Sequence, residues 1–94
     1  MSERRKFIII DPQDNVATAI VDLKARDRME DGECIVLLAC DIPFGHKFAL
    51  VDIAEGEYII KYGSAIGRAT SMIRGGDHVH VHNVQDIVDE VRKG

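Results

Sequence analysis

The hydrophobic residues of this chain fall into short runs separated by turn residues. The run over residues 7–10 predicts a strand that ends at Asp11-Pro12, because proline cannot donate a hydrogen bond to a sheet. β-Branched residues dominate positions 16–21 and predict a second strand there. A helix over residues 15–24, with Asn15 as its cap, is the competing interpretation of the same stretch.

A further pattern occurs three times: a glycine flanked by acidic residues or glycine, followed by a β-rich run. The turns are Asp31-Gly32-Glu33, Glu55-Gly56-Glu57 and Gly75-Gly76-Asp77, and the runs after them are residues 34–38, 58–60 and 78–82. Glycine provides the positive φ that such turns need. Recurrent turn chemistry explains the pattern more simply than internal duplication, which is the alternative. Short strands between glycine turns predict a compact, mostly β domain.

Two other stretches lie between these turns. Residues 48–53 predict a strand that follows a loop marked by Pro43 and Gly45. Gly63 and Gly67 stand four residues apart, a spacing that matches neither a dinucleotide-binding motif nor a P-loop. Close backbone approach between neighbouring strands is the better explanation of these two glycines.

The last apolar residues of the chain have helical spacing. Val84, Ile87, Val88 and Val91 follow the i, i+3, i+4, i+7 pattern and predict a C-terminal helix over residues 84–93. Asn83 stands where it could cap this helix. A helix this short must dock on its own domain or on a partner to persist.

Composition narrows the class of protein. Its 94 residues make a single domain over residues 1–94, and the net charge of −4 argues against a nucleic-acid partner or an anionic membrane. No apolar run is long enough to cross a membrane, and the first residues do not read as a signal peptide, so a cytoplasmic location is expected. Cys34 and Cys40 fit neither a metal motif nor a disulfide framework, and both are expected to be buried thiols.

The strongest candidate for chemistry is the alternation of histidine and valine over residues 78–82. On a strand, His78, His80 and His82 would share one face, with the valines on the other. Two histidines at i and i+2 can converge on one metal ion. Three on a straight strand span about 13 Å and would not all reach the same ion. A solvated or hydrogen-bonded histidine face is the alternative.

The dipeptide His46-Lys47 is the second candidate. It lies in the loop marked by proline and glycine, where an exposed position is expected. Histidine exchanges protons near neutral pH, and lysine can bind a carboxylate. An ordinary surface loop is the alternative interpretation of these two residues.

Taken in order, several motifs of the chain resemble one known family. They are Asp14-Asn15-Val16-Ala17, Ile42-Pro43-Phe44-Gly45-His46-Lys47, Asp52-Ile53-Ala54-Glu55-Gly56-Glu57, Ile60-Lys61-Tyr62-Gly63, Ile66-Gly67-Arg68-Ala69 and His78-Val79-His80-Val81-His82-Asn83. Together they resemble the small N-terminal domain of altronate and galactarate dehydratases, a SAF-type domain of β-clip fold. The small subunit of (2R)-sulfolactate sulfo-lyase belongs to the same group. The resemblance therefore implies a compact β-clip domain of short strands.

The resemblance also implies a metal-dependent lyase. Such enzymes remove the proton α to a carboxylate and expel a β substituent, which is water from a sugar acid or sulfite from sulfolactate. The implied cofactor is a divalent metal acting as a Lewis acid, with iron the first candidate and manganese or magnesium the others. By carry-over of the family's motifs, we expect His46 to handle protons and Lys47 to hold the substrate carboxylate. The residues expected at the histidine run are His80 and His82 on the metal, and His78 and Asn83 on the substrate.

The chain departs from the family's dehydratases in length. Those enzymes continue into a much larger catalytic domain, whereas this chain stops at Gly94. We expect a separate small subunit that is inactive until a large catalytic subunit completes the site, with the C-terminal helix as the docking element. A truncated piece of a longer enzyme is one alternative. A stand-alone module that binds a sugar acid or metal is another, and a homo-oligomer is compatible with each of these interpretations.

Overall fold

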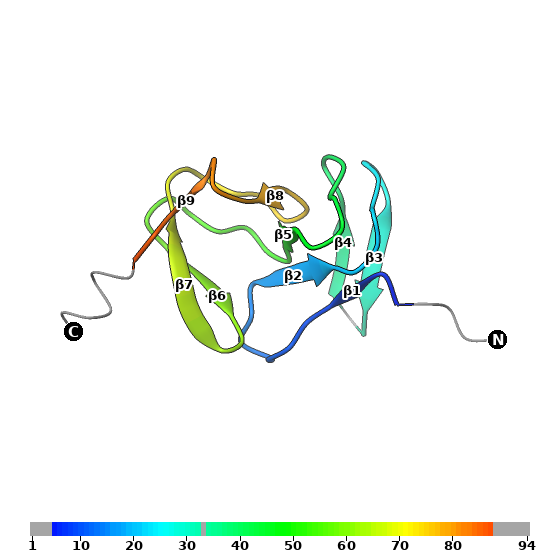
Figure 1. The fold of residues 1–94 in the computed structure, drawn as a ribbon, viewed down its shortest axis with the longest axis horizontal. Helices are drawn as coiled ribbons and strands as arrows, with labels where there is room; N and C mark the ends of the chain where they lie inside the picture. Colours follow the sequence, from blue (N-terminus) through cyan, green and yellow to red (C-terminus); the bar gives the residue numbers. More distant parts are fainter. Residues whose placement is uncertain (1–4, 33, 88–94) are drawn as a thin grey trace.

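Residues 5–32 and 34–87 are described by a computed structural model, in which the strands are short and no helix is present among these residues. The strands are β1 (Phe7–Ile8), β2 (Val16–Ala19), β3 (Arg28–Asp31), β4 (Cys34–Leu37), β5 (Lys47–Ala49), β6 (Tyr58–Lys61), β7 (Ser64–Ala69), β8 (His78–Val79) and β9 (Val84–Gln85). They form a four-stranded sheet in the order β1-β2-β5-β8, the hairpin β3-β4, and a three-stranded sheet β6-β7-β9 (Figure 1). All neighbouring strands are antiparallel. The mostly β architecture predicted from the sequence is confirmed.

Several predicted strands are found, and one predicted element is wrong where it can be checked. Strand β2 occupies part of residues 16–21, so the competing helix over residues 15–24 is excluded. The predicted helix over residues 84–93 does not begin at Val84, because Val84–Gln85 form β9 and pair with Ala69 and Arg68 of β7. Positions 88–93 of that prediction lie outside the described residues. The strand predicted over residues 48–53 ends early, at Ala49.

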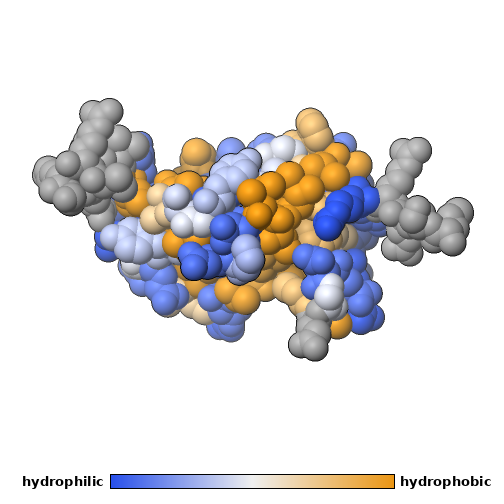
Figure 2. Space-filling view, turned by 90° about the horizontal axis from the view of Figure 1, so that it is seen from below, coloured by the Kyte–Doolittle hydropathy of each residue, from blue (hydrophilic) through white to orange (hydrophobic). Residues whose placement is uncertain are grey.

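The two cores lie on opposite sides of the four-stranded sheet. Successive residues of a strand point to opposite faces. Accordingly, Ala17 and Phe48 belong to one hydrophobic cluster, and Val16 and Ala49 to the other. Phe48 is fully buried and packs edge-on against Phe7, with the ring centroids 5.6 Å apart. The apolar interior still reaches the surface in places, and Figure 2 shows an apolar band between charged regions on one side of the molecule.

One turn recurs four times, over residues 20–29, 39–48, 50–59 and 70–79. In each copy the fourth residue is a buried aliphatic residue that forms a single β-bridge, the next four residues make the turn itself, and the last two begin the next strand. The bridges join the copies in pairs, Leu23 with Ile42 and Ile53 with Ile73. The third turn position has positive φ in every copy: 75° at Arg26, 85° at Gly45, 88° at Gly56 and 95° at Gly76. The predicted positive φ is confirmed at Gly32 as well, with φ of 62°, although that glycine turns the β3-β4 hairpin and is not part of the repeat.

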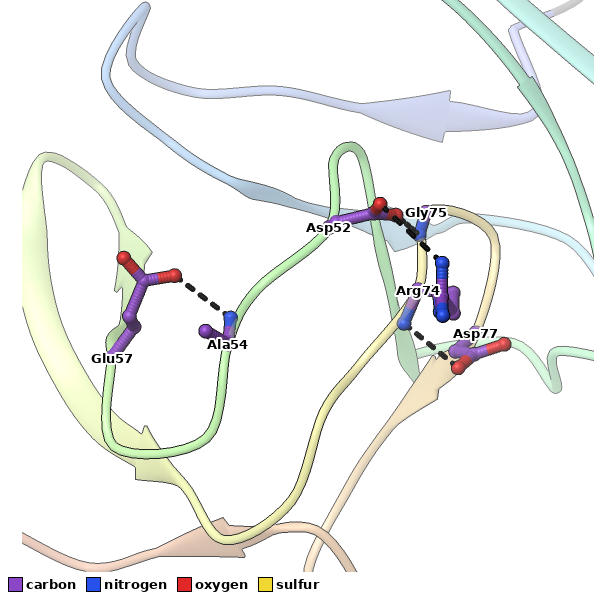
Figure 3. Close-up of polar contacts among 6 residues, drawn as sticks. All are labelled: Asp52, Ala54, Glu57, Arg74, Gly75 and Asp77. Carbon is purple, nitrogen blue, oxygen red and sulfur yellow. Dashed lines mark hydrogen bonds and ion pairs between the residues drawn. The ribbon is translucent and has the colours of Figure 1, made fainter.

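Carboxylates hold three of the four turns closed. The acid at the fourth turn position accepts a hydrogen bond from the amide of the first: Asp27 from Lys24 at 3.1 Å, Glu57 from Ala54 at 2.7 Å and Asp77 from Arg74 at 2.9 Å. A second aspartate reaches across each pair, so that Asp22 accepts from Phe44, Asp41 from Ala25 and Asp52 from Gly75 (Figure 3 shows the last). These bonds satisfy amides that no strand partner reaches.

The remaining turn departs from this pattern in two linked positions. Its first residue is Pro43, which has no amide hydrogen, and its fourth residue is His46, where the other copies have an acid. The backbone turn itself is kept, since the His46 amide donates to the Pro43 carbonyl at 3.0 Å. Because Pro43 has no amide hydrogen, the side chain of His46 is not needed to cap its own turn.

Asp14 and Asn15 join the four-stranded sheet to the β6-β7 hairpin. The Asn15 side chain accepts from the Ile60 amide at 2.7 Å and donates to the Tyr58 carbonyl at 2.9 Å. Asp14 accepts from the amide of Gly63 at 2.8 Å. Burial opposes ionisation of Asp14, but hydrogen bonds from backbone amides outweigh it and lower the pKa of this carboxyl.

Gly67 confirms the close approach expected between strands. An added Cβ at this position would overlap Cγ1 of Val84 and lie 3.1 Å from the carbonyl oxygen of Gln85. The absence of a side chain on β7 therefore lets β9 pair there. This contact also explains why the apolar residues at the end of the chain begin a strand instead of a helix: Val84 fills the space above Gly67.

Two glycines of the repeated turn should differ in how they tolerate alanine. Gly56 and Gly76 have φ of 88° and 95°, but only at Gly76 would an added Cβ overlap the carbonyl oxygen of Leu37. We expect Gly56→Ala to lower the free energy of unfolding by about 1 kcal/mol, the cost of a left-handed side-chain residue. Gly76→Ala should lower it by at least about 3 kcal/mol, because the backbone must also shift. Urea denaturation measures both, and equal losses would contradict the proposed packing.

The exchange of acid for histidine at position 46 can be tested by a double-mutant cycle. Pro43→Ala restores the amide hydrogen, and His46→Asp supplies the acceptor that the other turns have. We expect the double variant to be about 1 kcal/mol more stable than the sum of the single changes predicts. The control is the same cycle with His46→Ala, which should show no coupling; coupling of similar size there would argue against a capping bond.

Candidate metal centre

Pairing of β5 with β8 brings the two histidine-bearing segments together. Phe48 pairs with His78 and Lys47 with Val79, so the turn that ends at His46 lies beside the start of β8. Nδ1 of His46 is 2.8 Å from Nε2 of His78. At this distance one nitrogen carries the hydrogen and the other accepts it. The two residues are separated by thirty-two positions in the chain and meet only through this register.

The histidine run does not continue as the strand that the alternation predicts. Strand β8 ends at Val79, and residues 80–83 form a turn in which the Asn83 amide donates to the His80 carbonyl at 3.1 Å. Val79 is fully buried, as predicted, but Val81 is 81% exposed and faces away from the core. The prediction that both valines share one strand face is therefore wrong at Val81, because the chain turns before that residue.

Asn83 holds this turn closed. Its side-chain oxygen accepts from the His80 amide at 3.0 Å, and its side-chain nitrogen donates to the His78 carbonyl at 2.9 Å. The residue is 7% exposed. Its amide therefore has partners in the backbone of the histidine segment itself, which accounts for Asn83 without a ligand. The expected contact of Asn83 with substrate stays a prediction.

The turn gathers the imidazoles that a strand would have spread out. The ring centroid of His46 lies 5.0 Å from that of His78 and 4.4 Å from that of His80. His78 and His80 are 5.4 Å apart, and His82 lies 5.4 Å from His78. One nitrogen from each of His46, His78 and His80 lies within 4.8 Å of the others. The loop at residue 46 thus lies against the histidine run.

The surroundings of His78 and His80 lower the pKa of both rings. Loss of solvent lowers the pKa of His78, and repulsion from His46 and then from the other histidines and Lys47 lowers it further. The pKa of His80 is lowered by the same causes, desolvation first and His46 next. A lowered pKa leaves imidazole uncharged at neutral pH, which is the form that binds a metal.

Lys47 lies between the histidine cluster and a pocket. Its side chain is half-buried, and burial followed by repulsion from Lys61 lowers its pKa. The pocket beside it has a volume of about 430 Å³. It is lined by Lys47, Ile59, Ile66, His80, Val81, Val84 and Asp86. Lys47 can thus offer a cation next to His80, beside aliphatic residues that no local pattern predicted.

The three converging histidines suit a transition-metal ion. Three protein nitrogens with a further position left open is the donor set of many catalytic sites. Imidazole favours iron or zinc, whereas magnesium and manganese prefer carboxylate and water oxygens. The ligand pair expected from the sequence was His80 with His82, but the geometry favours His80 with His46 and His78. The site therefore fits iron better than magnesium.

The cysteines take no part in this cluster. Cys34 is half-buried beside the first core, so its predicted burial is found only in part, whereas Cys40 is exposed, so its predicted burial is wrong. Within residues 5–32 and 34–87 we also find no helix with the length and apolarity needed to cross a membrane.

Comparison with known proteins identifies the domain. The family of altronate/galactarate dehydratase SAF domains matches residues 5–87. Altronate dehydratase of Escherichia coli (strain K12) is 45% identical over 80 residues, covering 85% of this chain and 16% of that enzyme. Altronate dehydratase of Bacillus subtilis (strain 168) is 38% identical over 88 residues, covering 94% of this chain and 18% of that enzyme.

A relative of similar size also matches. The (2R)-sulfolactate sulfo-lyase subunit alpha of Chromohalobacter salexigens is 37% identical over 91 residues, covering 84% of this chain and 92% of that subunit. The chain thus spans less than a fifth of the two altronate dehydratases but nearly all of the sulfo-lyase subunit. The resemblance of its motifs is confirmed, and the chain belongs to the family of altronate/galactarate dehydratase SAF domains.

Proposed function

We propose that this chain is the small subunit of a metal-dependent sugar-acid dehydratase of the altronate/galactarate type, and that it completes the active site of a large subunit. Relatives named as dehydratase and sulfo-lyase support the reaction class, which is a lyase. The match to a separate subunit alpha along most of its length supports a small-subunit role.

The observation that carries the proposal is the convergence of His46, His78 and His80. Their ligand nitrogens lie within 4.8 Å of one another on a domain of a family named for dehydratases. In this proposal these three rings hold the metal and His82 supports His78 from the side. When bound, a divalent ion would supply a Lewis acid that stabilises the negative charge developing on the substrate as its α proton leaves.

The other residues of the site orient the substrate in this proposal. Lys47 stands next to His80 and offers a cation to the substrate carboxylate. Asn83 keeps the turn of residues 80–83 closed, so that His78 and His80 stay on the same side as His46. With His46 on the metal, the base that takes the α proton comes from the large subunit.

A (2R)-sulfolactate sulfo-lyase is the second candidate, and the similarity to a sulfo-lyase subunit alpha supports it. The sulfo-lyase relative is a separate subunit that this chain nearly covers, whereas the altronate dehydratases are several times longer. Both candidates share the abstraction of an α proton and differ in the group that leaves, which the large subunit would select.

Metal binding by the isolated chain tests the proposed ligands directly. We expect anaerobic calorimetry to detect tight binding of Fe²⁺ and Zn²⁺, and no comparable binding of Mg²⁺. His46→Ala, His78→Ala and His80→Ala should each weaken Fe²⁺ binding by at least about tenfold. His82→Ala is the matched control from the same turn and should retain most of the affinity.

Two results would contradict this proposal. Equal loss of affinity in all four variants would indicate a general effect on the turn, and unchanged affinity in the first three would exclude the ligand set.

An activity assay is the second test of the proposal: altronate, galactarate and (2R)-sulfolactate are supplied to the chain together with a large dehydratase polypeptide. Metal binding without turnover of any substrate would favour a stand-alone binding module.

A further inference from the structure

Large apolar side chains are exposed on both turns that carry the histidines. Phe44 precedes His46 by two residues and is 66% exposed. Val81 stands between His80 and His82 and is 81% exposed. Val81 is continuous with the pocket beside His80, where Ile66 is also 40% exposed. Exposed apolar residues are therefore found on both of the turns that supply the histidines of the candidate metal centre.

The aliphatic part of the pocket, away from Lys47 and His80, does not match a sugar acid. Four of the pocket's seven lining residues are aliphatic, and one of these, Ile59, is fully buried. The hydroxyl groups of a sugar acid would find few hydrogen-bond partners against such walls, which is unfavourable. An aliphatic or aromatic side chain fits this lining better, and pockets of this kind hold the anchor residues of protein interfaces.

The relatives indicate what kind of molecule could supply that side chain. The chain matches only 16% and 18% of the two altronate dehydratases, so most of each enzyme lies outside the region of similarity. Proton abstraction next to a carboxylate is favoured in a site from which water is excluded. None of His46, His78 and His80 is buried, so the cluster needs a cover that the described part of this chain does not supply.

We infer that Phe44, Val81, Ile66 and the pocket beside His80 form the docking surface for a large catalytic polypeptide, which inserts an apolar side chain into the pocket. This inference rests on the proposed function and adds the location and chemistry of the subunit contact. The lining of the pocket also includes Lys47 and Asp86, which carry opposite charges, so the complementary surface of the partner has an apolar centre with polar groups at its border.

The experiment uses a defined partner. The probe is altronate dehydratase of Escherichia coli without the segment that this chain matches, co-expressed with the full chain and purified as a complex. We expect Phe44→Ser with Val81→Ser to weaken the complex by at least about tenfold in Kd, measured by light scattering and calorimetry. The matched control is Ile35→Ser with Leu37→Ser, which removes aliphatic residues of similar exposure, 53% and 62%, from β4. The control should leave the complex intact.

A second measurement does not depend on the folding of the shortened partner. A chimera in which this chain replaces the matching segment of the intact enzyme is digested by a protease, and the Phe44 and Val81 changes should speed cleavage at the junction. The inference is overturned if neither the separate polypeptides nor the chimera shows docking, or if the control pair has the larger effect. It is also overturned if the chain alone forms a dimer that these two changes dissociate, since a second copy would then cover the surface.

Fe²⁺ binding by the isolated chain distinguishes this inference from the proposed function. The Phe44 and Val81 changes should leave that binding unaltered, because neither side chain offers a ligand. If the complex forms and depends on these residues while His46→Ala has no effect on Fe²⁺ affinity, the docking surface stands and the proposed metal ligands fail.

Discussion

The fold depends on closing the same tight turn four times in a short chain. Each closure needs a positive φ and, where an amide faces no strand, an acceptor for its hydrogen. Aspartate and glutamate provide the acceptor in three copies, and the aspartates also reach across between paired copies. The turns are thereby fixed in pairs, and strands β5 and β8 begin where these turns end. The histidine site is therefore positioned by backbone hydrogen bonds.

The candidate site arises where the pattern is broken. Pro43 removes the amide that an acid would cap, and His46 then turns to His78 instead. On the facing segment, Asn83 closes a turn one residue after Val79 and folds His80 back toward the other rings. Because Pro43 has no amide hydrogen to cap, a histidine can replace the capping acid at position 46 at little cost in stability. The domain thereby gains an imidazole that contacts His78. In the other three turns the fourth residue is an acid that caps the amide of the first residue, so a histidine at that position would leave this amide without its acceptor.

Much of the fold could be predicted from the sequence, because turn residues and β-branched runs are local signals. The positive φ of Gly32, Gly56 and Gly76 and the strands at residues 16–19 and 34–37 are of this kind. The fourfold repeat could not be predicted, because Arg26 stands where a glycine is expected and Gly45 lacks acidic neighbours. Strand β9 could not be predicted, since Val84 owes its extended backbone to Gly67, which is distant in sequence.

The histidine site, too, could be predicted only where local sequence determines the structure. Alternation with valine correctly placed Val79 in the core, but the side-chain bonds of Asn83 override the alternation after that residue. The meeting of His46 with His78 depends on the register of β5 and β8, which no local pattern encodes. The family likeness, by contrast, was visible in the order of the motifs, because it rests on residue identity and not on geometry.

The most direct test of this account is a zinc titration followed by the imidazole nitrogen resonances of the uniformly ¹⁵N-labelled chain. Zn²⁺ is diamagnetic and suits imidazole ligands, so each ring can be observed as it binds. The account predicts that nitrogens of His46, His78 and His80 shift together and saturate at one equivalent, while His82 changes little. Shifts confined to His80 and His82, or independent titration of the four rings, would contradict it.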